Sequence, residues 1–201
     1  MGEKIKISED EMILEFLQAE IESSRFQKVL SEELKTQESD HSLIITPDLT
    51  DPKQNSLRKS IFKKYRDYEN ENGLFEGFPK DVEWFVEDLS KETLFTNVFY
   101  IDYSYWNEIT NGTRLPIDAV ERINNDIKVF DVPYDNFIAA SSDFKQGKKF
   151  KRLILVSDGS KYVIVEGHLR MTVYAMNPDL VPESLQVIVG YSKSIHGWTS
   201  F

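Results

Sequence analysis

Two apolar runs near the C-terminal end decide the fold: RLILV at residues 152–156 and KYVIV at residues 161–165. The four residues SDGS, at positions 157–160, separate them. An Asp-Gly pair tolerates the positive φ values that a tight β-turn requires, so this pattern predicts a β-hairpin. Because both faces of each run are apolar, we expect the two strands to lie centrally in a covered sheet.

The segment EGHLR, at residues 166–170, follows the second run directly. Apolar residues then keep helical spacing as far as Pro178, which predicts a helix that begins at this turn. Gly167 lets the backbone turn sharply, and the first free amides of a helix, with the dipole behind them, favour an anion. Strand, glycine and helix together predict an anion site.

Three side chains of this turn are candidates for chemistry. Arg170 can hold a phosphate or carboxylate through two hydrogen bonds. His168 can donate a hydrogen bond or move a proton near neutral pH. In the structural alternative, Glu166 caps the helix and Arg170 pairs with a surface carboxylate, which contributes little free energy.

The rest of the chain gives a coarser picture. We expect a strand at 126–133, a helix at 134–144 and a closing strand at 185–189. Further towards the N-terminus the patterns predict a helix that begins at the capping box of Ser8 and breaks near Ser23, a loop at 36–55 with at most a short extended piece at 43–46, a helix over 57–68, a helix over 79–89, a strand at 95–101 and a short helix at 116–124.

The fold class that follows is α+β. A mainly helical region, residues 1–125, is expected to pack on a small α/β domain with a mixed sheet, residues 126–201. We also expect Trp198 and Phe201 to pack back onto the body, because exposed aromatic surface is costly.

The order of elements from about Lys128 to Ser192 resembles the ParB/sulfiredoxin superfamily. The shared features are an entry strand ending in Val-Pro, here VFDVP at 129–133, then a helix, a hairpin, a Gly-His-x-Arg turn that opens a helix, and a closing strand. In that superfamily the turn lies at a nucleotide or phosphate site. The resemblance therefore implies that Gly167, His168 and Arg170 bind a phosphorylated ligand.

The branches of the superfamily differ in this turn. Sulfiredoxins carry a catalytic cysteine in it, and this chain has no cysteine. Partition ParB proteins have a downstream DNA-binding helix-turn-helix, for which too little chain follows Arg170. The Asp-Gly-His-Thr-Arg turn of the free-serine kinases is the most similar, and it implies phosphotransfer or hydrolysis on a nucleotide with Mg²⁺. Glu166 would then be base or metal ligand, and His168 would contact phosphate.

Composition and charge leave two other functions open. The formal net charge of −10 opposes sequence-independent nucleic-acid binding, but two basic clusters, at 145–152 and 58–66, would suit a DNA-associated protein of nuclease-like or regulatory type. A catalytically silent interaction module is the third hypothesis. Its mark would be an Arg170 held by a structural carboxylate.

Several smaller expectations complete the prediction. Arg66, Trp106 and Arg114 could line a cleft against the C-terminal domain. The spacing of the three histidines predicts no zinc site. The N-terminal sequence contains no apolar signal region and no stretch is apolar enough for a membrane span, so a cytoplasmic protein without a membrane partner is expected.

Overall fold

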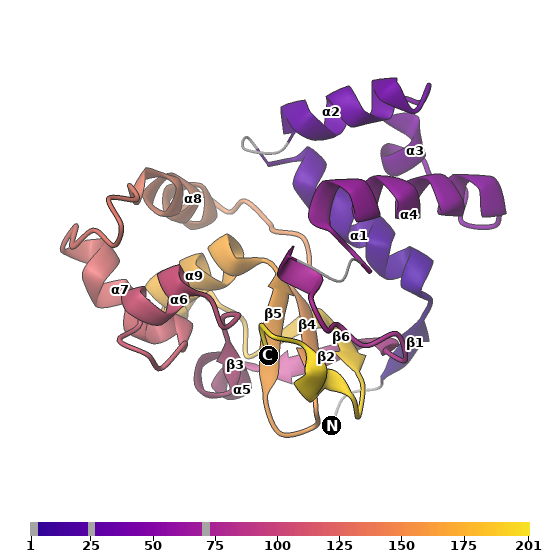
Figure 1. The fold of residues 1–201 in the computed structure, drawn as a ribbon. Helices are drawn as coiled ribbons and strands as arrows, with labels where there is room; N and C mark the ends of the chain where they lie inside the picture. Colours follow the sequence, from indigo (N-terminus) through magenta and orange to yellow (C-terminus); the bar gives the residue numbers. More distant parts are fainter. Residues whose placement is uncertain (1–3, 24–26, 70–72) are drawn as a thin grey trace.

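The computed structural model describes residues 4–23, 27–69 and 73–201, and within them the fold is α+β (Figure 1). Its strands are β1 (Ile5–Ile7), β2 (Glu83–Ser90), β3 (Val98–Phe99), β4 (Ile154–Ser157), β5 (Tyr162–Glu166) and β6 (Ser184–Tyr191). Its α-helices are α1 (Glu9–Ile21), α2 (Gln27–Thr36), α3 (Ser42–Ile45), α4 (Pro52–Arg66), α5 (Lys91–Thr96), α6 (Ser104–Ile109), α7 (Pro116–Asn124), α8 (Asp135–Lys145) and α9 (His168–Met176).

The six described strands form one mixed sheet in the order β1-β2-β6-β4-β5-β3. β2 pairs antiparallel with both β1 and β6, and β4 pairs antiparallel with β5. The pairs β6 with β4 and β5 with β3 are parallel. Strands from both sides of residue 125 thus share one sheet, while the division of the chain into two domains at that residue stays a prediction.

Helices cover both faces of the sheet. Ile154, Val156 and Ile188 belong to a core shared with α1, α2, α3 and α4. Leu155 and Val189, whose side chains alternate with these, belong to a second core that includes residues of α5, α6, α7 and α9. The period of two along each strand sends side chains to opposite faces, so both faces must be apolar. The predicted hairpin and its central, covered position are confirmed.

The N-terminal region is helical, as expected. Ser8 forms the predicted capping box with Glu11, since each side chain bonds the other residue's backbone amide. α1 ends at Ile21 and α2 begins at Gln27, so the helix predicted to break near Ser23 does so, although residues 24–26 lie outside the described part. No helix among the described residues is long and apolar enough to cross a membrane.

The C-terminal segment packs back as predicted. Trp198 is buried, donates a hydrogen bond of 2.7 Å from Nε1 to the carbonyl of Leu74, and packs edge to face on Phe78. Phe201 is also buried. The tail therefore belongs to the core beneath α1 and α4.

The helix predicted over 79–89 is wrong, because these residues contribute the strand β2. Val82, Phe85, Val86 and Leu89 do have helical spacing, but the segment is also rich in the aromatic and β-branched residues that favour strands. Its eight residues pair with β6, which lies about a hundred positions further along the chain. That long-range pairing overrides the local spacing.

Three shorter predictions also need correction. The expected strand at 126–133 is reduced to an isolated bridge between Val129 and Val132, since none of the strands in the described part of the chain pairs with it. The strand expected at 95–101 shrinks to Val98–Phe99, because α5 already occupies 91–96. The extended piece expected at 43–46 is the short helix α3. The helices predicted at 116–124 and 134–144 are confirmed as α7 and α8.

A substitution at Gly190, which pairs with Trp84 of β2, would test how tightly β6 packs at this point. A Cβ at this position would lie 2.5 Å from Cγ1 of Val82 and 2.7 Å from Cζ3 of Trp84. We expect Gly190→Ala to lower the free energy of unfolding by about 1–3 kcal/mol, the usual cost of overpacking. Urea unfolding measures this, with the exposed Ser184→Ala on the same strand as control. Equal stability of both variants would contradict the packing described.

Candidate functional site

The strand-glycine-helix turn forms where it was predicted. β5 ends at Glu166, Gly167 has a φ of 111°, and α9 begins at His168. A Cβ on Gly167 would lie only 2.5 Å from Cδ2 of Leu153. Gly167 is therefore required for two reasons. Its backbone is left-handed, and the side chain of Leu153 leaves no room for a Cβ.

Arg170 is buried and holds this turn together. Its Nη1 donates to the carbonyl oxygens of Lys151, at 2.9 Å, and Arg152, at 2.7 Å. Its Nη2 donates to Oε1 of Glu166 at 2.5 Å, as an i,i+4 ion pair. The guanidinium thus joins the end of β5 to the segment that precedes β4, and a ligand would have to compete with these three acceptors.

His168 lies inside an aromatic stack. Its ring is 5.0 Å from the ring of Trp106, which is itself 4.1 Å from the ring of Tyr100. Burial, together with the positive charges of Arg66 and Arg170, lowers the pKa of His168 to about 3. The imidazole is therefore neutral at pH 7. Its Nε2 has no hydrogen-bond partner among the described residues.

Glu20 joins the site from the last turn of α1. The side chain is buried, and this burial, followed by the negative charge of Glu166, raises its pKa to about 7. Arg66 and Arg170 pull the pKa in the opposite direction, and the hydroxyl of Tyr65 donates to Oε2 of Glu20 at 3.5 Å. Two carboxyl groups and two guanidinium groups therefore interact at this point, where Glu20 and Arg170 are buried and Arg66 and Glu166 are partly exposed.

Sequence reasoning missed Glu20, although a signal exists. Glu20 stands three positions after Leu17 and four after Phe16, so it falls on the apolar face of α1. A charged residue on a buried stripe is unusual and is a better marker of a site than an exposed charge. The ends of α1 and α4 and the start of α9 meet at this point.

The predicted cleft wall is brought together only in part. Arg66 lies near Glu20 and His168, and Trp106 stacks on His168. Arg114 lies elsewhere in the network: its Nε donates to the carbonyl of Tyr100 at 2.9 Å and its Nη1 to the carbonyl of Phe201 at 3.0 Å. Its role is to anchor the C-terminal segment.

Carboxylates within the chain engage much of the two basic clusters. Lys59 bonds Glu9 at 2.7 Å and Glu69 at 2.9 Å, and Lys64 bonds Glu33 at 2.7 Å. Arg58 is buried among backbone and side-chain acceptors. In the second cluster Lys148, Lys151 and Arg152 pair with Asp143, Glu22 and Glu15 respectively. The DNA-associated function stays a prediction.

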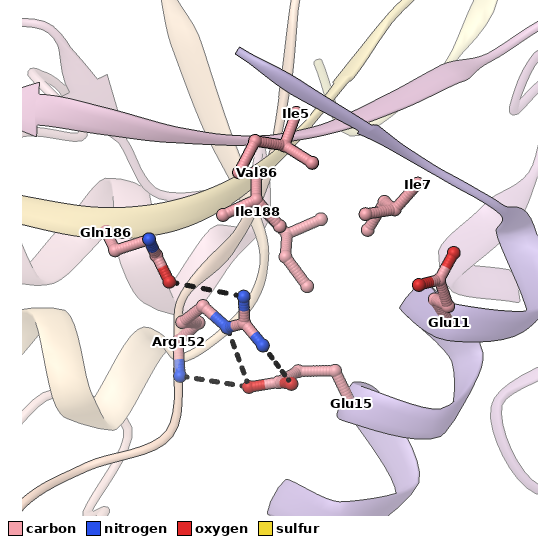
Figure 2. A pocket seen from close by; sticks show the side chains of 8 residues that line it. All are labelled: Ile5, Ile7, Glu11, Glu15, Val86, Arg152, Gln186 and Ile188. Atoms are coloured by element: carbon pink, nitrogen blue, oxygen red, sulfur yellow. Dashed lines mark hydrogen bonds and ion pairs between the residues drawn. The ribbon is translucent and has the colours of Figure 1, made fainter. Parts of the chain in front are cut away.

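A pocket of about 260 Å³ lies beside α1, between that helix and β1, β2 and β6 (Figure 2). Arg152 stands at its wall, with Nη2 3.1 Å from Oε2 of Glu15 and Nη1 3.3 Å from Oε1 of Gln186. The backbone amide of Arg152 also donates to Glu15. Arg152 thus bonds Glu15 on one side and Gln186 on the other, which fastens α1 to β6, whereas Glu11 bonds Ser8 in the capping box.

No family model, no curated protein and no solved structure matches this chain. The resemblance to the ParB/sulfiredoxin superfamily therefore stays a prediction, and the contacts of Glu20 and of residues 166–170 define the candidate site.

The chemistry available at the turn is that of two interacting carboxyl groups beside two arginines, and of the two carboxyls only that of Glu20 is buried. Glu20 can hold a proton near neutral pH, while neutral His168 can donate or accept one hydrogen bond. No group of three His, Asp or Glu side chains within the described ranges is arranged to hold a metal ion. A cation at this place would need ligands from a bound molecule as well as from the carboxylates.

The raised pKa of Glu20 predicts a pH dependence of stability. In the folded chain the raised pKa lets Glu20 keep its proton up to about pH 7, whereas the ordinary pKa of a glutamate carboxyl is 4.5. The unfolding free energy of the wild type should therefore fall by roughly 2–3 kcal/mol, relative to Glu20→Gln, as the pH rises from 4.5 to 7.

Urea unfolding at several pH values measures this difference. Glu22→Gln, at the exposed end of the same helix, is the matched control and should keep the wild-type slope. A constant difference between wild type and Glu20→Gln over this pH range would refute the assignment.

Proposed function

We propose that the protein binds a phosphorylated ligand, a nucleotide with Mg²⁺, at residues 166–170 together with Glu20, and acts on it by phosphotransfer or hydrolysis. The observation that carries this proposal is the buried Glu20. Its carboxyl lies in the same electrostatic environment as Glu166, Arg66 and Arg170.

Burying Glu20 lowers the stability of the fold, so packing alone does not account for this residue. It is buried, a second carboxylate raises its pKa, and it stands in the last turn of a helix, where the dipole disfavours an acid. An apolar residue of similar size would satisfy the packing of α1 at lower cost. Residues that break local rules in this way concentrate at functional sites.

The groups at the turn suit a magnesium nucleotide. Mg²⁺ is commonly held by one or two carboxylates plus phosphate oxygens, which here would be Glu20, Glu166 and the ligand. Arg170 would bind phosphate, and neutral His168 would donate to a phosphate oxygen through its unpartnered nitrogen. A carboxyl with a pKa near 7 suits the transfer of a proton from an attacking hydroxyl or water.

The EGHLR segment adds a second line of support through its resemblance to the turn of the free-serine kinases. Glu166 stands where those kinases carry Asp, so it inherits the role of base or metal ligand only as a proposal. Glu20 is a further candidate base, and the two carboxyls would then divide the roles of proton acceptor and metal ligand.

A second function, a catalytically silent interaction module, is favoured by one observation. Arg170 already donates to Glu166 and to two backbone carbonyls, which is the arrangement expected when the turn serves only the fold. In that case Glu20 would be a tolerated defect, and no phosphorylated ligand would stabilise the protein.

Thermal unfolding with a panel of nucleotides, with and without Mg²⁺, separates the two functions. At about 100 times its dissociation constant, a ligand adds roughly 2.7 kcal/mol to the stability of the native state. We expect a stabilising nucleotide that needs Mg²⁺, and we expect Glu20→Gln to weaken its binding about tenfold or more, since an amide cannot ionise to a carboxylate when the cation binds.

Glu22→Gln is the control and should bind as the wild type does. Absence of a shift with every nucleotide would leave the interaction module as the better account. A shift that is unchanged in Glu20→Gln would refute the part given to Glu20 in ligand binding.

A further inference from the structure

The connection between α7 and α8 presents an exposed apolar surface. Ile127, Phe130 and Val132 in the connection and Ile138 in the first turns of α8 are between 39% and 65% exposed, and Phe130 is the most exposed of them. We refer to these four residues as the Phe130 surface. It belongs to the helical layer opposite α1–α4, at the margin of the molecule (Figure 1).

Phe130 stands at the tip of a tight turn that does not suit it. The amide of Val132 donates to the carbonyl of Val129 at 3.0 Å, and the two central residues, Phe130 and Asp131, have φ values of 52° and 56°. Two successive positive φ values define a type I′ turn, for which Asn-Gly is preferred. A bulky side chain in the left-handed region is a genuine outlier and costs free energy.

Buried neighbours hold the turn in this strained form. Val129 and Tyr134 lie in the core, and the Tyr134 hydroxyl donates to the carbonyl of Ile127 at 2.7 Å. The core thus fixes both ends of the turn, while the aromatic ring between them points out of the fold. Strain that persists under such support is a mark of recognition sites.

The charges beside the Phe130 surface are mainly negative. Asp126, Asp131 and Asp135 are exposed. The basic residues nearby are Lys128, with Nζ 3.9 Å from a carboxylate oxygen of Asp126, and the half-buried Arg122, which interacts with Tyr134 and donates to Oδ1 of Asn111. A partner for this surface must therefore cover apolar side chains and bring positive charge to their border.

We propose that the Phe130 surface docks a segment of another protein whose apolar face is flanked by Lys and Arg. Nucleic acid has the wrong sign of charge, and a second copy of this chain, with its net charge of −10, would meet like charge at the same border. An apolar centre with a complementary charged rim is the usual anatomy of such an interface. This proposal does not depend on the phosphate site.

The experiment uses the full chain and two short amphipathic helical peptides, one of Leu and Lys and one of Leu and Glu. Binding is followed by calorimetric titration at low and moderate salt. The decisive variant is Phe130→Asn, which keeps the charge and suits the turn, so its melting temperature should rise by about 2–4 °C. Ile45→Asn, an exposed apolar residue on the other helical layer, is the matched control.

We expect the Leu/Lys peptide to bind the wild type and Ile45→Asn alike, and Phe130→Asn roughly tenfold or more weakly. Several results would overturn the proposal: equal binding to Phe130→Asn, equal binding of the Leu/Glu peptide, or no binding of either peptide. Self-association that Phe130→Asn abolishes, seen by sedimentation, would instead identify a second copy as the occupant.

Discussion

The antiparallel pairing of β2 with β6 is the constraint on which the other parts of the structure depend. It joins eight residues, Glu83–Ser90, to eight residues about a hundred positions later in the chain. Because β6 also pairs with β4, this ladder ties the N-terminal strands to the C-terminal hairpin. The loop entropy of so distant a contact is large, and burial on both faces of the sheet must offset it. Once it forms, α1–α4 are placed over one face and α5–α9 over the other.

The elements that the sequence predicted correctly are determined by residues close together in the chain. The elements that it did not predict depend on residues far away in the chain. The hairpin at 152–165, α9 and the capping box of Ser8 are specified by residues within a few positions of one another. β2 is different, because its apolar spacing fits a helix as well as a strand, and only β6 decides between them. Residues 126–133 have strand composition but no neighbouring strand, so they form a turn.

The same distinction between local and distant causes applies to the candidate site. The turn at 166–170 was predictable, since a strand, a glycine and a helix in succession determine its backbone. The protonation of the side chains at this turn could not be predicted from the sequence. That His168 is neutral follows from the packing of Trp106 and from two arginines, and that Glu20 has a raised pKa follows from the docking of α1. Neither contact can be derived from spacing along the chain.

The network around Arg170 connects the turn at 166–170 with α1. The carbonyls of Lys151 and Arg152 accept from Arg170, while the side chain of Arg152 bonds Glu15 on α1, and Glu20 on the same helix lies in the field of Arg170. In the proposed function, a phosphate that drew Arg170 away from these acceptors would remove support from the segment that fastens α1. A cation bound by Glu20 would restore an attraction between that helix and the turn. A ligand bound as proposed would therefore act on Arg170 and Glu20 directly, and on the Arg152–Glu15 contact of α1 through the segment that Arg170 supports.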